Sequence, residues 1–249
     1  MFTNRFGVRP QSLITNNLIF IIMGLNISKG NMYDFISHTW NVLKGRCLHA
    51  CIYCFMLAMA HRFNNMKDLH LDEAELRVNL GKGNFIFVGS STDMFAADVP
   101  ADWIMRVLDY ANKFENSYLW QSKNPARILE FIDHPVFQKS VVCTTIETNR
   151  WYPDIMNNAP LPEERAKAMA AISAIGVTTY VTCEPFIAFD HDALIALIRA
   201  CNPAQVNIGK NSVRSVCLPE PTRDEVQAFI ADLKTFTNVK VKSNASEWM

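Results

Sequence analysis

Three cysteines lie close together in the first quarter of the chain, at positions 47, 51 and 54, in a Cys-x3-Cys-x2-Cys run. Three thiolates within eight residues can converge on one soft metal centre. They match the protein part of a [4Fe-4S] cluster whose fourth iron has no cysteine ligand. An iron left open in this way can take an exogenous ligand. The run therefore predicts a cluster that does chemistry, with Cys47, Cys51 and Cys54 as its metal ligands.

These cysteines could instead bind zinc or form disulfides. A structural zinc site usually has four protein ligands, often as two Cys-x2-Cys pairs, and here the remaining cysteines are isolated. His49 lies inside the cysteine loop and His61 follows it, so a Cys3His zinc site stays open as an alternative. A disulfide framework is disfavoured, because the chain is long, has an odd number of cysteines, seven, and shows no evident secretory signal.

The composition sets broad limits on the fold and on partners. A length of 249 residues with 49% hydrophobic residues allows one large α/β domain or two small ones. Lys and Arg together number 24, as do Asp and Glu, so net charge gives no global case for binding nucleic acid. A local basic patch stays open. Seven cysteines that form no disulfide framework fit a reducing compartment, which predicts a cytoplasmic protein.

The N-terminal region contains a dense apolar run at residues 18–23. It is far shorter than the roughly 20 residues that span a bilayer, so no membrane association is predicted. Three interpretations stay open: a weak signal peptide, an extra strand or short helix that covers the core, or a natural start at Met23. We expect residues 1–36 to form an extension of a domain at 37–249, and residues 1–22 to be dispensable for its activity.

The rest of the sequence alternates between short β-rich runs and helical stretches, with no linker, internal repeat or low-complexity segment. Six β–α units predict a parallel sheet buried on both faces. Six are too few for an eight-stranded barrel, so the expected fold class is α/β, a partial (β/α)6 barrel in a single domain. The predicted strands are 37–44, 85–89, 118–121, 140–146, 177–183 and 205–208, with a further short strand at 239–242. The predicted helices are 55–64, 100–113, 125–131, 162–174, 190–201 and 222–236.

Polar side chains follow the strands at the points where ligands bind in parallel α/β folds. Each has a simpler alternative. The segment from Gly89 to Asp93 could form only a turn, Lys123 could be a solvated loop lysine, and Glu147 could be a surface carboxylate paired with Arg150. The candidate cofactor-binding residues at these strand ends are Gly89, Ser90, Ser91, Thr92, Asp93, Gln121, Lys123, Thr145, Glu147, Glu184 and Asn207.

The cysteine spacing, together with Tyr53 just before the last cysteine, closely resembles the signature of the radical S-adenosylmethionine (SAM) superfamily. The resemblance implies a partial barrel, SAM chelated by the open iron, and reductive cleavage of SAM to a 5′-deoxyadenosyl radical. It also implies that Tyr53 and Phe55 border the adenine and that Glu147 binds the ribose or the substrate. The family's polar motif for the SAM amino group has a different form here, Gly-Ser-Ser-Thr-Asp at residues 89–93.

Three further segments resemble an uncharacterised, phage-associated branch of that superfamily, which is distantly similar to spore photoproduct lyase. They are residues 39–41, 90–95 and 183–185. The chain departs from the lyase because it lacks an obvious extra domain, and the surroundings of Cys143 do not mark it as a hydrogen donor.

The resemblance implies an enzyme that abstracts hydrogen from an unidentified substrate and takes electrons from a donor such as flavodoxin or ferredoxin. A nucleotide or nucleic acid substrate is the runner-up within enzymes. An iron-sulfur redox or iron-sensing binding protein that does not cleave SAM is the alternative of a different class. Production of deoxyadenosine discriminates between the enzyme and the sensor.

Overall fold

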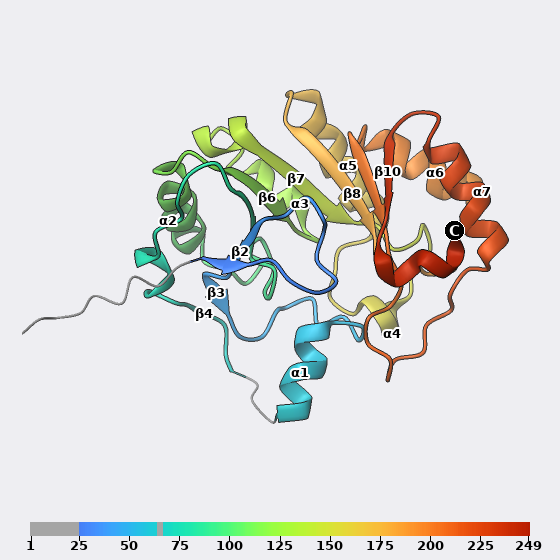
Figure 1. Cartoon of the computed structure of the whole chain (residues 1–249), viewed down its shortest axis with the longest axis horizontal. Coiled ribbons are helices and arrows are strands. Elements are labelled where there is room, and N and C mark those ends of the chain that lie inside the picture. The colour runs from blue at the N-terminus through green and yellow to red at the C-terminus, as the bar shows by residue number, and fades with distance from the viewer. Residues whose placement is uncertain (1–24, 64–66) are drawn as a thin grey trace, which may run out of the picture.

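A large sheet with helices packed on it makes up most of the computed structural model, which describes residues 25–63 and 67–249 (Figure 1). In these residues the sheet has eight strands in the order β1-β2-β5-β6-β7-β8-β9-β10. β1 pairs with β2 in antiparallel fashion, and every other pairing is parallel. The strands are β1 (Asn26–Ile27), β2 (His38–Trp40), β5 (Phe85–Val88), β6 (Ser117–Gln121), β7 (Ser140–Thr145), β8 (Thr178–Cys183), β9 (Gln205–Ile208) and β10 (Asn238–Val241).

Helices connect successive parallel strands, and a small second sheet pairs β3 (Leu43–Lys44) with β4 (His70–Leu71). The helices are α1 (Phe55–Phe63), α2 (Ala101–Asn112), α3 (Pro125–Leu129), α4 (Pro153–Met156), α5 (Pro162–Ala174), α6 (His191–Ala200) and α7 (Arg223–Leu233). Short 3-10 segments are η1 (Glu75–Arg77), η2 (Pro135–Lys139) and η3 (Ser243–Trp248). No helix in the described ranges has the length and hydropathy needed to span a bilayer.

The two faces of the sheet are buried by different parts of the chain. Successive side chains of a strand point to opposite faces, so Ile86 and Val88 join the core beneath α2, α5, α6 and α7, while Phe87 faces the other way. On that second face Tyr33 and Ile36 cover the sheet, and the segment that precedes β2 crosses it in Figure 1. The predicted parallel α/β sheet, buried on both faces in one domain, is confirmed in this form.

The large sheet is open, and part of the predicted N-terminal extension belongs to it. The sheet is not closed, because β1 and β10 are its two edges and do not pair. Within the predicted extension, residues 25–36 supply β1 and two core side chains, Tyr33 and Ile36. Met23 and the apolar run at 18–23 lie outside the described residues, so the expectations about them stay predictions.

The strands and helices match the predicted ranges closely, except that one predicted strand is too long. The strand predicted at 37–44 stops at Trp40, and Leu43 and Lys44 leave the large sheet to pair with β4. At this break the Asn41 side-chain oxygen accepts hydrogen bonds from the Ser90 hydroxyl and the Ser91 backbone N–H after β5. The further strand predicted at 239–242 is present as β10.

Candidate functional site

The three cysteines line one cavity of about 920 Å³ at the edge where the parallel strands end. This volume is near the top of the roughly 300–1,000 Å³ range of small-molecule sites, so there is room for a cofactor and a second ligand. The cavity brings together most of the predicted site residues. Those that line it are Cys47, Cys51, Tyr53, Cys54, Phe55, Gly89, Ser90, Ser91, Thr92, Asp93, Gln121, Lys123, Thr145 and Glu184. Two do not line it, Glu147 and Asn207, and both are buried.

The cysteine loop is held by hydrogen bonds to residues 152–158, which include α4. Asn157 and Asn158 donate side-chain hydrogen bonds to the carbonyl oxygens of Ala50 and Leu48, at 2.7 and 2.9 Å. The Cys51 thiol donates to the Met156 carbonyl oxygen at 3.6 Å. Ala50 has a φ of 49°, a left-handed conformation that costs free energy in a residue with a side chain. These contacts hold the loop in a defined shape by protein bonds alone.

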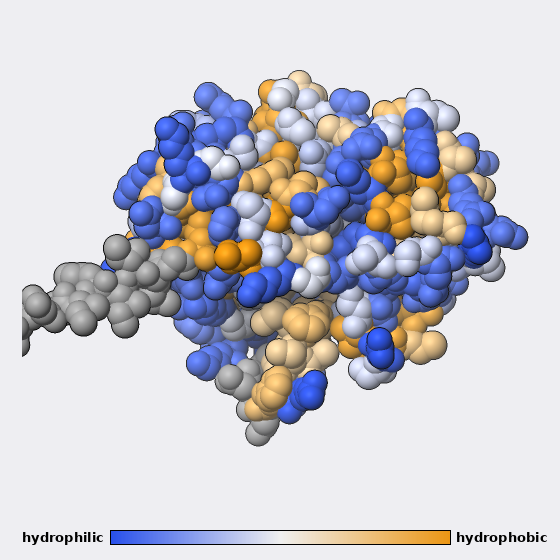
Figure 2. Space-filling view, viewed as in Figure 1, coloured by the Kyte–Doolittle hydropathy of each residue, from blue (hydrophilic) through white to orange (hydrophobic). Residues whose placement is uncertain are grey.

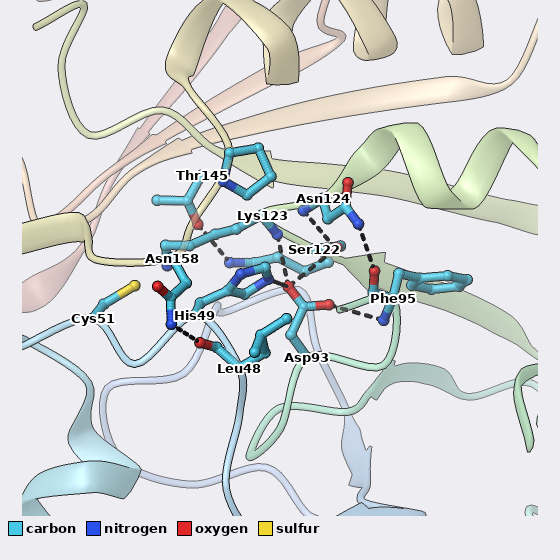
Figure 3. Close-up of polar contacts among 12 residues, drawn as sticks. Leu48, His49, Cys51, Asp93, Phe95, Ser122, Lys123, Asn124, Thr145 and Asn158 are labelled. Atoms are coloured by element: carbon cyan, nitrogen blue, oxygen red, sulfur yellow. Dashed lines mark hydrogen bonds and ion pairs between the residues drawn. The ribbon is translucent and has the colours of Figure 1, made fainter. Parts of the chain in front are cut away.

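The segment after β5 is tied to the same loop through the Asp93 carboxylate (Figure 3). His49 donates to it from Nε2 at 2.9 Å, and the hydroxyl of Ser122 and the backbone N–H of Lys123 donate at 3.0 and 2.8 Å. The backbone N–H of Phe95 donates to its other oxygen at 2.9 Å. Burial alone would raise the pKa of Asp93, but the His49 ring and the backbone donors outweigh it and hold the pKa below its usual value.

These bonds change the role of the predicted polar motif at residues 89–93. Asp93 is already filled by protein donors, the Ser90 hydroxyl binds Asn41, and the Thr92 hydroxyl donates to the Gly45 carbonyl oxygen at 3.1 Å. Among the described residues no partner binds the Ser91 hydroxyl, which faces the same cavity. The motif therefore ties the cysteine loop to the end of β5, and its predicted role in binding the cofactor stays a prediction.

Glu147 lies behind the cavity wall in a buried network rather than on the surface. Its Oε2 accepts from Arg165 on α5 at 2.7 Å, and both side chains are 0% exposed. Its Oε1 accepts from the hydroxyl of Tyr53 in the cysteine loop. Arg150, the alternative partner considered for Glu147, pairs with Asp190 at 2.6 Å. Glu147 thus links the cysteine loop to helix α5 through two fully buried contacts.

Lys123 completes this network from the end of β6. Its side chain is 18% exposed, its Nζ is 3.7 Å from Glu147, and it lies 5.2 Å over the Tyr53 ring. Burial alone would lower its pKa, but the nearby acidic groups of Cys51 and Glu147 raise it, so Lys123 keeps its charge. Two cations, Lys123 and Arg165, share one carboxylate here. The excess positive charge beside the cysteines fits a negatively charged group in the cavity.

Glu184 and Asn207 lie towards the other edge of the sheet and differ in access. Glu184 lines the cavity and accepts hydrogen bonds from Lys242 at 2.6 Å and from Asn31 at 3.1 Å. Its side chain occupies the space where a Cβ of Gly209 would lie, 2.7 Å from the nearest atom, so the close packing requires glycine there. Asn207 is buried inside β9 and accepts from Gln205 at 2.8 Å, away from the cavity.

An iron-sulfur cluster and a single metal ion make different demands on the positions of the cysteines. In the part of the chain that the structure describes, no three His, Cys, Asp or Glu side chains are close enough together to hold one metal ion. A [4Fe-4S] cluster makes no such demand, because each of its thiolate ligands binds a different iron. Burial raises the pKa of Cys47 to about 12, so a metal must displace the proton when it binds. His49, the alternative zinc ligand, binds Asp93 through Nε2, and its buried Nδ1 has no partner among the described residues. A carboxylate on the second ring nitrogen is usual for a histidine that binds a metal, so the Cys3His alternative stays open.

Gly45, just before the first cysteine, provides a test of the loop geometry. Its φ is +99°, and an added Cβ would lie 2.1 Å from the Asp68 carbonyl oxygen. We expect Gly45→Ala to lower the free energy of unfolding by about 1–3 kcal/mol and to weaken cluster retention, because the loop must shift. Urea unfolding and iron content measure the two effects.

Gly83→Ala is the matched control for Gly45→Ala, since Gly83 also has a positive φ, +73°, but no atom lies within 4 Å of its added Cβ. Equal losses of stability in the two variants would mean that strain in φ, and not the clash with Asp68, explains the need for Gly45.

The fold is similar to solved structures of two kinds of enzyme. Spore photoproduct lyase with dinucleoside spore photoproduct has a TM-score of 0.61 at 8% identity, over 88% of this chain and 80% of that one. A second lyase structure, with bound AdoMet and dinucleoside spore photoproduct, has a TM-score of 0.52 at 8% identity, over 86% and 66%. SuiB of Streptococcus suis, bound to the precursor peptide SuiA, has a TM-score of 0.51 at 11% identity, over 82% and 48%.

The sequence itself matches no curated protein. A family model described as a protein of unknown function matches residues 31–192, from the segment before β2 to the first residues of α6. This range includes the cysteine loop and the ends of β5, β6, β7 and β8. Because the match covers more than half of the chain, the protein belongs to the family Protein of unknown function (DUF5131).

Proposed function

We propose that this protein is a radical SAM enzyme that binds a [4Fe-4S] cluster through Cys47, Cys51 and Cys54. The observation that carries the proposal is the position of the Cys-x3-Cys-x2-Cys loop, which lines one cavity together with the ends of the parallel strands from β5 to β10. The fold likeness to a lyase with bound AdoMet supports SAM as the second cofactor. The proposal includes the partial (β/α)6 barrel of that superfamily, with the open sheet as its wall. Membership of a phage-associated branch stays a prediction.

Cys47, Cys51 and Cys54 would hold the cluster, which would supply an electron for the reductive cleavage of SAM. The chain's own residues position these groups and exclude water. Lys123 holds a positive charge beside the cysteines, and Glu147 fixes Tyr53 from behind the wall. Ser91, Gln121 and Thr145 offer polar groups that face the cavity. A small electron-transfer protein such as flavodoxin or ferredoxin would be the electron donor.

The test is SAM cleavage by anaerobically reconstituted protein with dithionite as reductant. We expect 5′-deoxyadenosine and methionine in equal amounts, measured by liquid chromatography with mass spectrometry. The control is the same protein with all three loop cysteines changed to alanine. Protein that holds a full complement of iron but forms no deoxyadenosine would contradict the proposal and favour an iron-sulfur sensor.

A further inference from the structure

Charges around the cavity are unbalanced, although the chain as a whole is neutral. Six Lys or Arg residues but only two Asp or Glu residues line it among the described residues. The cations are Lys29, Arg46, Lys67, Lys123, Lys210 and Lys242, and the acids are Asp93 and Glu184. Both acids are already engaged, Asp93 by four donors and Glu184 by Lys242. Lys123 and Lys210 also have acidic partners outside the lining, Glu147 for the first and Glu220 and Glu247 for the second, so the unbalanced charge lies on the remaining cations.

Three of these cations have no acidic partner within ion-pair distance in residues 25–63 and 67–249: Lys29, Arg46 and Lys67. All three are exposed, and the segments outside those ranges contain no Asp or Glu that could neutralise them. The backbone N–H of Arg46 donates to the Lys67 carbonyl oxygen at 2.9 Å, so these two residues are neighbours. Asp68 and Asp98 line a smaller cavity that Arg46 also borders, without forming an ion pair with it.

The proposed cofactors do not account for these exposed charges. SAM carries a sulfonium cation and would be repelled by further positive charge. A cluster held by three thiolates has a small negative charge, and the partly buried Lys123 already lies beside the cysteines. The three exposed cations therefore remain available to a negatively charged group of a substrate.

The exposed cations and the cysteines differ in burial, although both line the same cavity. Lys29, Arg46 and Lys67 are exposed, whereas Cys51 is buried and Cys47 and Cys54 are partly buried. Helix α1 adds apolar lining from Met56, Leu57 and Ala60, and Figure 2 shows apolar surface over this helix. A ligand that fits this arrangement keeps several negative charges at the solvent side and places one less polar group inside. Nucleic acid strands have this form, since a basic groove holds the backbone while a single base is turned into a pocket.

We propose that the substrate is phosphate-bearing, a segment of single-stranded nucleic acid whose backbone phosphates bind Lys29, Arg46 and Lys67 while one nucleotide enters the cavity. This inference rests on the proposed function for the reaction that follows, but the binding itself does not depend on it. A free nucleotide offers the same phosphate chemistry, and the experiment separates the two sources.

The test uses the full-length reconstituted protein and a fluorescently labelled oligonucleotide of about 12 nucleotides and mixed sequence, with binding measured by anisotropy at several salt concentrations. We expect the variant K29Q/R46Q/K67Q to bind at least about tenfold more weakly, and its salt slope to fall by about 2, since each lost phosphate contact on a single strand removes about 0.7. The control variant K82Q/K167Q/K234Q removes the same charge from exposed lysines that do not line the cavity, and it should bind within about twofold of the wild type.

Competing ligands decide the source of the phosphate. Displacement of the oligonucleotide by another strand but not by AMP supports a strand as substrate. Displacement by AMP at equal concentration of phosphate supports a free nucleotide and overturns the strand. Failure of the wild type to bind, equal weakening by both triple variants, or equal competition by polyglutamate overturns the proposal. Because binding is measured without reductant, absence of SAM cleavage would refute the proposed function and leave this result standing.

Discussion

Anaerobically reconstituted wild type is expected to hold about four irons and four sulfides per chain, and changing Cys47, Cys51 and Cys54 together to alanine should remove them and the brown colour. The three thiols line one cavity, and each would bind its own iron, so no other ligand replaces them there. The loop shape depends on His49, Asn157 and Asn158, and the variant should therefore stay folded. Iron and sulfide analysis with circular dichroism measures both outcomes.

Two single variants serve as controls for the loss of iron. Cys217 is the exposed cysteine among those described and does not line the cavity, and Cys143 is buried within β7. Cys217→Ser and Cys143→Ser should each keep a full complement of iron. Full iron in the triple alanine variant would refute the cluster assignment. Stoichiometric zinc in protein purified without oxygen would favour the Cys3His site instead.

Changing Glu147 to alanine is expected to lower the free energy of unfolding by about 3–5 kcal/mol, because the variant leaves the Arg165 guanidinium buried with no carboxylate. Tyr53 also loses the acceptor of its hydroxyl. Urea unfolding of the metal-free protein measures the effect without any contribution from iron. Glu73→Ala is the matched control, since the Glu73–Arg106 pair is exposed on both sides and its loss should change little.

A double variant and the pH dependence make this prediction sharper. Glu147→Leu/Arg165→Met removes both charges and should be less destabilised than Glu147→Ala, because no buried ion is left unpaired. Burial alone would raise the pKa of Glu147, but Arg165 and Lys123 outweigh it and hold the pKa below its usual value. The stabilisation is therefore complete above the unfolded-state pKa of about 4.3 and is lost as the pH falls through the lower folded-state value. The gap between wild type and Glu147→Gln should close on acidification, and a constant gap would contradict the assigned pairing.

The sequence predicted which residues meet, because parallel strands bring their carboxyl ends to one edge whatever the details of packing. It could not predict the exact role of residues beyond the last strand position. β7 ends at Thr145, so the alternation that places Thr145 at the cavity gives no orientation for Glu147, which turns behind the wall. Asn207 lies within β9, where its register buries it beside Gln205.

Arg165 and the support at residues 152–158 were missed for different reasons. Arg165 carried a signal, since it lies at helical spacing from Ala168, Met169 and Ile172, all of them on the buried side of α5. A charged residue on an apolar stripe indicates a buried partner. The support of the cysteine loop carried no such signal, because Asn157 and Asn158 look like ordinary turn residues. Their function depends on contacts more than 100 positions apart, and one sequence does not record these.

The bonds that shape the cysteine loop come from amide, carboxylate and imidazole groups and not from metal. Iron-sulfur groups are destroyed by oxygen, and many small metal-binding domains unfold when their metal leaves. Here the Asp93–His49 contact and the asparagines beneath the loop would persist after such damage. If the proposed cluster were lost to oxygen, the loop would keep these contacts, and the same chain could take up a new cluster.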